Sequence, residues 1–185
     1  MKIRIFAILS LIAATLAFSS CIDDEATEEV VFNEDLAEIQ AYLDTTSIVN
    51  VKEYYDEGRG ITVIWQELSA SNDTVALGDT LKVNYIGRLL SGKAFDTSLE
   101  DVAKAEGVYN SQRKYMPLVF RIGIGQLVTG FEVATSVMEV GDKATVFIPS
   151  FYAYGRQGTS DGRIPGNTPI MFELELLEVT PGPQQ

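Results

Sequence analysis

The residues that could do chemistry in this chain gather around one glycine-rich stretch at 123–132, which reads GIGQLVTGFE. Its three glycines permit a tight or left-handed backbone. Between them lie Leu127 and Val128, an apolar step without charge. From Phe131 to Met138 the apolar residues then recur at helical spacing. The stretch predicts a turn that brings apolar side chains and a helix start into one place, although a solvent turn before a core helix would give the same pattern.

Several other kinds of site are excluded by residue type. The third glycine comes too late for a G-x-G-x-x-G dinucleotide fingerprint, and no Gly-Lys-Ser/Thr step forms a phosphate loop. The chain has no histidine, which removes Ser-His-Asp and Cys-His catalysis and histidine-based metal sites. A formal net charge of −12 opposes nucleic-acid binding, because phosphates need a basic surface. Composition does not exclude a carboxylate pair for glycoside hydrolysis, but no sequence feature isolates one.

Further motifs flank the glycine-rich stretch. Upstream are VNYIG at 83–87 and GKAFDTS at 92–98, and downstream are FYAYG at 151–155, RIP at 163–165 and a closing strand at 169–179. In this order the motifs resemble the FK506-binding-protein (FKBP) family of peptidyl-prolyl isomerases, over roughly residues 61–179. Several separated motifs in the right order are much rarer by chance than one short motif.

The resemblance implies rotation about Xaa-Pro peptide bonds. No bond is broken in this reaction, which is slow because the twisted amide loses its resonance. The twisted form is less polar than the planar one, so an apolar pocket that excludes water and fits the twisted form lowers the barrier. Such a pocket needs no cofactor and no metal.

The resemblance also implies residue roles. Those expected to act on the substrate are Tyr154, Asp96, Phe131 and Val128. Those expected to line the pocket are Tyr85, Phe95, Leu118, Leu127, Ile164 and Phe172. Tyr154 would donate its hydroxyl to a substrate carbonyl, and the Val128 backbone N–H would bind a second one. Phe131 would form the floor of the pocket, and Asp96 its polar rim. Ordinary core or hairpin packing is the alternative for each residue, most strongly for Tyr85 and Phe172.

Three features depart from the family pattern. Many FKBPs have tryptophan where this chain has Phe131, which we expect to alter affinity rather than abolish activity. Small FKBPs often have an aromatic wall where this chain has Leu118, which should loosen the pocket. Residues 99–115 replace a loop of only a few residues. We expect a loop there, with room for one helical turn, either at the pocket rim or as surface decoration.

The motifs must be positioned by a domain in which strands outnumber helices. Alternating and β-branched segments predict strands at 61–65, 81–90, 117–122, 143–149 and 169–179, around a helix at 131–138. This spacing favours an α+β fold with an antiparallel sheet. The resemblance implies a curved antiparallel sheet wrapped around one short α-helix, with an N-terminal helical extension. We assign the isomerase domain to residues 61–180 and a tail to 181–185.

The start of the chain has the features of a targeting segment. Lys2 and Arg4 precede a nearly unbroken apolar run at 5–18, too short for a membrane span, so residues 1–20 are predicted to be a signal peptide. Cys21 is the only cysteine, so no intramolecular disulfide can form. Its place after small residues resembles a bacterial lipoprotein acceptor, although Phe18 departs from the usual branched residue. We expect lipidation of Cys21 rather than ordinary cleavage.

Residues 21–60 are predicted to be a tether and a short helix. The acidic run at 23–29 fits a solvated tether or, as in Bacteroidetes-like lipoproteins, a signal for export to the cell surface. The helix is expected at 33–42 with Asn33 as its cap. Its apolar stripe, Leu36, Ile39 and Leu43, would pack on its own domain or, alternatively, form a dimer.

Together these features predict a lipid-anchored FKBP-type peptidyl-prolyl cis-trans isomerase of a bacterial cell envelope, at the periplasmic or surface face of the outer membrane. Its expected partners are proline-containing unfolded or exported polypeptides, the membrane through its lipid anchor, and FK506-like macrolides as pocket ligands. One alternative is an FKBP fold that holds unfolded chains or a partner without turnover. A second is a surface ligand-binding lipoprotein, which would rest only on the anchor and the acidic run.

Overall fold

A computed structural model describes residues 24–183 of the chain. The predicted signal peptide and Cys21 lie outside these residues. The chain divides into two compact units, residues 1–30 and residues 31–185. The described part of the first unit is the beginning of helix α2 (Asp24–Thr45).

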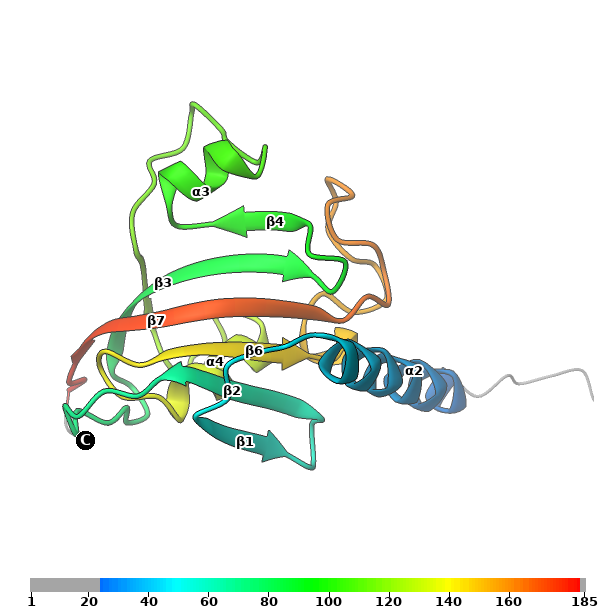
Figure 1. Ribbon diagram of the computed structural model, residues 1–185, viewed down its shortest axis with the longest axis horizontal. Helices are drawn as coiled ribbons and strands as arrows, with labels where there is room; N and C mark the ends of the chain where they lie inside the picture. The colour runs from blue at the N-terminus through cyan, green and yellow to red at the C-terminus, as the bar shows by residue number, and fades with distance from the viewer. Residues whose placement is uncertain (1–23, 184–185) are drawn as a thin grey trace, which may run out of the picture. The chain divides into compact units, whose positions relative to one another are not determined.

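The second unit contains one antiparallel sheet of seven strands, in which six follow the order β1-β2-β6-β7-β3-β4 (Figure 1). The seventh strand, β5, pairs with β3. The strands are β1 (Lys52–Asp56), β2 (Ile61–Glu67), β3 (Thr80–Leu89), β4 (Ala94–Thr97), β5 (Leu118–Arg121), β6 (Lys143–Ile148) and β7 (Ile170–Thr180). The strands expected from the sequence are therefore confirmed, with β1 and β4 added. β7 lies between β6 and β3, so the last described strand in sequence is central in the sheet.

Helix α4 (Thr129–Ser136) packs on the inner face of this sheet. Phe131 and Ala134 of the helix join the same buried cluster as Val146 of β6 and Phe172 of β7. Since side chains alternate along a strand, one set of residues from each strand meets the helix. The predicted α+β fold, a curved antiparallel sheet with one short helix packed on it and a helix at the N-terminal side, is confirmed.

The glycine-rich stretch connects β5 to α4. Gly123 and Gly125 have φ angles of 83° and 69°, a backbone conformation that favours glycine. Glycine is needed at position 130 for a different reason, since a Cβ there would overlap the side chain of Ile148 on β6. The glycines thus turn the chain and then allow α4 to begin directly against the sheet.

The outer face of the sheet carries a second buried cluster, which we call the outer cluster. It consists of Ile39, Ile64, Leu90, Phe147 and Met171, with Tyr42, Leu43 and Ile48 packed against it. The ring centroids of Tyr42 and Phe147 are 5.6 Å apart. The prediction that the helical stripe packs on its own domain is confirmed for Ile39 and Leu43.

The predicted bounds of the N-terminal helix were wrong. Helix α2 begins at Asp24 rather than after Asn33, which is an exposed residue inside the helix rather than its cap. The physical reason is that residues 24–32 hold neither glycine nor proline and include alanine and glutamates, which favour helix. The acidic residues at 24–29 are consequently part of this helix. Within residues 24–183 no helix is long and apolar enough to cross a bilayer.

Two shorter helices complete the second unit. Helix α3 (Glu100–Ala105) lies in the 99–115 insertion, where a loop with room for one helical turn was expected. A 3-10 helix, η2 (Ser150–Tyr152), follows β6. It opens the long connection from β6 to β7, which carries Tyr154 and Ile164.

Candidate active site

Four aromatic side chains gather between the inner face of the sheet and α4. This aromatic cluster consists of Tyr85 from β3, Phe95 from β4, Phe131 from α4 and Phe172 from β7. Phe131 lies with its ring centroid 5.2 Å from that of Phe172 and 6.1 Å from that of Tyr85, both in edge-to-face geometry. Phe95 and Phe172 are 5.5 Å apart, also edge to face. The cluster is apolar and nearly closed to water.

The sheet positions these rings through its register. Gly87 of β3 lies opposite Phe172 of β7 and opposite Asp96 of β4. A Cβ at position 87 would overlap the rings of both Phe95 and Phe172. The glycine of the VNYIG motif therefore leaves the space in which the two rings meet.

A polar network borders the cluster at Tyr85. The Tyr85 hydroxyl donates to Oδ2 of Asp96 at 2.5 Å and accepts from Nη2 of Arg113 at 2.8 Å. Arg113 also forms an ion pair with Asp96. Burial, and secondly the hydrogen bond to the Asp96 carboxylate, raise the pKa of Tyr85 well above its usual value. The Tyr85 hydroxyl therefore already has both an acceptor and a donor as hydrogen-bond partners.

Tyr154 contrasts with Tyr85. Its ring meets the edge of Phe95 at a centroid distance of 6.3 Å and packs against the buried cluster. Among residues 24–183 nothing forms a hydrogen bond with its hydroxyl. Burial raises the pKa of Tyr154, and the negative charges of Asp96 and Asp161 add to the effect. Tyr154 is thus a protonated donor, at the border of the aromatic cluster, whose hydroxyl is available.

A second available donor lies at the start of α4. Val128 is the N-terminal cap residue of the helix, in extended conformation, and its carbonyl accepts from the N–H groups of Phe131 and Glu132. Its own N–H has no acceptor within the described part of the chain. The first N–H groups of a helix lack partners in the helix itself. The side chains of Leu127 and Val128 are half-buried against the cluster.

The remaining predicted site residues lie in the same buried core. Ile164 is fully buried, and Leu118 is half-buried at the start of β5. The structure therefore brings all ten predicted site residues to one side of the sheet. Their roles in binding and catalysis stay predictions.

Sequence reasoning missed Arg113. It lies in the 99–115 insertion, between Tyr109 and Tyr115, whose rings stack at 5.6 Å. The guanidinium lies 5.2 Å from the Tyr115 ring while its nitrogens reach Asp96 and Tyr85. The insertion thus contacts the polar border of the cluster. No local pattern marks one arginine of a polar loop as the partner of a residue 17 positions earlier.

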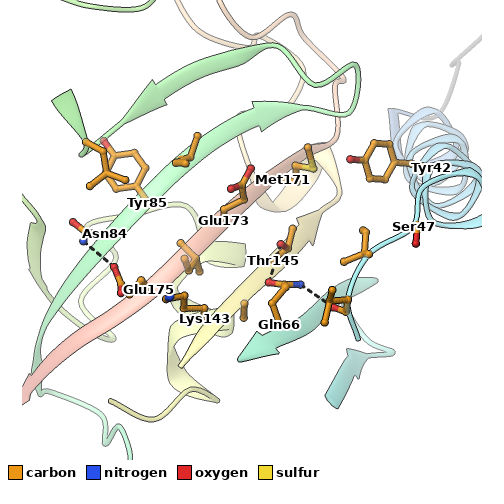
Figure 2. A pocket seen from close by; sticks show the side chains of 16 residues that line it. Tyr42, Ser47, Gln66, Asn84, Tyr85, Lys143, Thr145, Met171, Glu173 and Glu175 are labelled. Carbon is orange, nitrogen blue, oxygen red and sulfur yellow. Dashed lines mark hydrogen bonds between the residues drawn. The ribbon is translucent and has the colours of Figure 1, made fainter. Parts of the chain in front are cut away.

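A groove of about 480 Å³ lies on the opposite, outer face of the sheet (Figure 2). Its polar groups largely bond one another: Asn84 donates to Glu175 at 3.0 Å, and Thr145 donates to Gln66 at 3.2 Å. Among residues 24–183 there is also no group of three or more side chains suited to hold a metal ion.

Comparison with known proteins gives a consistent result. The family model "FKBP-type peptidyl-prolyl cis-trans isomerase" matches residues 71–177. A short-type peptidyl-prolyl cis-trans isomerase of Methanocaldococcus jannaschii is 47% identical over 78 residues, 42% of this chain and 49% of that protein. FK506-binding protein 2 of Dictyostelium discoideum is 36% identical over 55% of this chain and 66% of its own length.

A third relative is FK506-binding protein 1 of Saccharomyces cerevisiae, 35% identical over 55% of this chain and 77% of its own length. The chain thus spans from about half to about three quarters of the length of these three relatives. It spans 24% of FK506-binding protein 4 of Emericella nidulans, to which it is 32% identical.

Proposed function

The chain belongs to the family of FKBP-type peptidyl-prolyl cis-trans isomerases, and on that premise we propose that it catalyses rotation of Xaa-Pro bonds at the aromatic cluster. The observation that carries the proposal is the Tyr154 hydroxyl, a protonated donor without a partner beside a buried aromatic surface. Enzymes accelerate a reaction through contacts that are stronger in the transition state than in the ground state. The proposal assigns Tyr154 such a contact.

The reaction requires removal of water from the Xaa-Pro bond and two hydrogen-bond donors for the substrate. The planar amide is stabilised by resonance that places negative charge on its oxygen, and rotating it costs ~18–20 kcal/mol. An apolar surface favours the less polar twisted amide. Tyr154 and the Val128 N–H then hold carbonyls on either side of the proline while the bond turns. Phe131 forms the floor, and the other predicted lining residues exclude water.

Asp96 has an indirect part in this mechanism. Its carboxylate accepts from Tyr85 and pairs with Arg113, so it fixes one wall of the cluster rather than exchanging a proton. Proton transfer is not needed, because no bond to hydrogen changes in the reaction. Asp96 and Tyr85 therefore shape the border across which the polypeptide lies.

The test is the isomerisation rate of a proline-containing peptide, followed by protease coupling or by exchange spectroscopy. We expect the purified protein to accelerate it, and FK506 to compete, as the names of the relatives suggest. An absence of both acceleration and FK506 binding would contradict the enzyme proposal.

A second candidate is an FKBP fold that binds chains without useful turnover. The observation that favours it is the low solvent exposure of the aromatic cluster. Phe131 is only 3% exposed, and its neighbours Phe95 and Phe172 are nearly as buried. Binding to unfolded polypeptide at equilibrium, with no change in isomerisation rate, would support this candidate over the first.

We further propose that the protein is anchored to a bacterial envelope membrane through lipid on Cys21, and assists the folding of exported proteins there. The support is the apolar run at 5–18 followed by small residues and the single cysteine. Cys21→Ser should move the protein from the membrane fraction to the soluble fraction. A wild-type protein that is soluble, or a variant that stays membrane-bound, would refute the anchor.

A further inference from the structure

Asp35 is a buried carboxylate that the proposed mechanism does not use. It lies on α2, is only 3% exposed, and reaches across 115 positions of sequence to Ser150. Its Oδ2 accepts from the Ser150 N–H at 2.7 Å and from the Ser150 hydroxyl at 2.6 Å. Burying a carboxylate is costly unless donors satisfy it, and Ser150 supplies two.

Ser150 is the first residue of the turn that carries Tyr154. It begins the 3-10 helix η2 directly after Pro149. Its carbonyl accepts from the Ala153 N–H at 3.0 Å and from the Gly155 N–H at 2.8 Å. Tyr154 lies between these two residues. The backbone that presents the Tyr154 ring is therefore closed by hydrogen bonds onto the residue that Asp35 holds.

A ring contact from α2 supports the same turn. Phe32, one helical turn before Asp35, meets the ring of Tyr152 edge to face at a centroid distance of 6.4 Å. This part of α2 thus contacts both the first and the last residue of η2. The following turns of α2, with Ile39 and Leu43, contact the outer cluster instead.

A contact that only holds α2 against η2 would not need a carboxylate. Apolar side chains of similar size hold two elements together without the cost of burying a charge. A carboxylate with two hydrogen bonds fixes direction as well as distance. The orientation of the turn matters here, because the Tyr154 hydroxyl has no hydrogen-bond partner among residues 24–183. Its position is therefore set only by the backbone of the turn and by the packing of its ring.

We propose that Asp35 is a positioning residue, which together with Ser150 fixes the turn that presents the Tyr154 hydroxyl to the substrate. The assignment of a substrate rests on the proposed function. The inference adds that the N-terminal helix sets the geometry of the site from outside the family's matched region, residues 71–177.

The experiment compares three variants of the full protein. Asp35→Ala removes both hydrogen bonds, Asp35→Asn keeps an acceptor, and Ile39→Val is a matched control that trims a buried contact of the same helix with the outer cluster. Hydrogen exchange of the Ala153 and Gly155 amides reports on the turn without reference to activity. The second measurement is kcat/KM for a Xaa-Pro peptide, at a temperature at which every variant is folded.

We expect Asp35→Ala to speed exchange at Ala153 and Gly155 by about tenfold or more, and to lower kcat/KM by roughly three- to tenfold. Asp35→Asn should recover part of both effects, and Ile39→Val should change neither. If Asp35→Ala does not fold, Ser150→Ala replaces it, because it removes the hydroxyl donor and keeps the N–H donor. It should then show smaller changes of the same sign.

The two possible failures are distinguishable. Exchange at Ala153 and Gly155 that is the same in Asp35→Ala as in Ile39→Val would overturn the positioning role, even in an active enzyme. An equal loss of kcat/KM in both variants would also overturn it, since a merely structural effect explains that result. A wild type that is inactive, with faster exchange only in the Asp35 variants, would refute the proposed function while supporting the link from Asp35 to the turn.

Discussion

The two faces of the sheet differ in the kind of side chain they bury. The inner face buries an aromatic cluster whose rings meet edge to face, beside a donor without a partner. The outer face buries mostly aliphatic residues under α2. Neighbouring residues of one strand supply both, as Phe172 and Met171 of β7 do. A single strand can therefore contribute to two regions, the proposed substrate site on one face and the contact with α2 on the other.

The largest expected effect is on the inner face. Phe131→Ala removes a ring that three others contact, so it should lower the free energy of unfolding by ~3–5 kcal/mol. It should also abolish isomerase activity in the fraction that remains folded, because the proposed floor of the substrate site is lost. Denaturant unfolding gives the first quantity, and an assay well below the melting temperature gives the second. Full activity in the folded variant would place the site elsewhere.

The matching change on the outer face should separate stability from activity. Met171→Ala empties a buried position of the outer cluster and should cost ~2–5 kcal/mol of stability. Activity per folded molecule should stay at the wild-type level, because the residue points away from the aromatic cluster. The same two measurements apply. A fall in kcat/KM comparable to that of Phe131→Ala would mean that the two faces are not independent.

A smaller effect is expected from removing one hydroxyl. Tyr154→Phe keeps the ring and deletes a donor, whose net contribution in a neutral hydrogen bond is ~0.5–1.5 kcal/mol. The value of kcat/KM should fall by that free energy, from a few-fold to about tenfold, and the melting temperature should barely move. Tyr42→Phe makes the same chemical change in contact with the outer cluster and should leave activity unchanged. Equal kcat/KM in both variants would remove Tyr154 from the mechanism.

The smallest effect is a pH dependence of stability from Asp35. Burial raises the pKa of Asp35, and Glu34 adds repulsion, although the bonds from Ser150 act in the opposite direction. A folded pKa above the unfolded one means that the native state holds the proton more tightly. The stability from this group is then present below the unfolded pKa and is lost as pH rises through the folded one.

Asp35→Asn cannot titrate, so it isolates this contribution. The melting temperature of the wild type minus that of Asp35→Asn should decrease as pH rises from about 4 to neutrality. Tyr154→Phe provides the control on the inner face, because the raised pKa of Tyr154 keeps the phenol neutral throughout this range. A difference that grows with pH would show that Ser150 holds the carboxylate more strongly than burial opposes it.

The two faces also differ in how far the sequence predicted them. The inner face follows from local patterns: alternation along β7 separates Phe172 and Leu174 from Met171 and Glu173, and glycines mark the turn before α4. The aromatic residues of the site were assigned through the order of motifs. These signals are local or shared with a family, so they can be recognised in one chain.

The outer face carried weaker signals. Alternation along β6 puts Phe147 on the face opposite Val146, but it does not show that α2 covers that face. Asn33 looked like a helix cap, yet helix-favouring residues before it extend the helix to Asp24. The bonds from Ser150 to Asp35 and from Arg113 to Tyr85 join residues far apart in sequence. Such pairs depend on the assembled fold and leave no periodicity to detect.

The central place of β7 has a consequence for the order in which the chain can fold. During synthesis, β3 and β6 emerge before β7, so each strand at first lacks one of its neighbours in the sheet. Until residues 170–180 arrive, both strands present unpaired edges, which favours contact with other chains and slows folding through long-range pairing. The seven-stranded sheet is therefore complete only once residues 170–180 have joined it, because the β1-β2-β6 group and the β3-β4-β5 group meet only through β7.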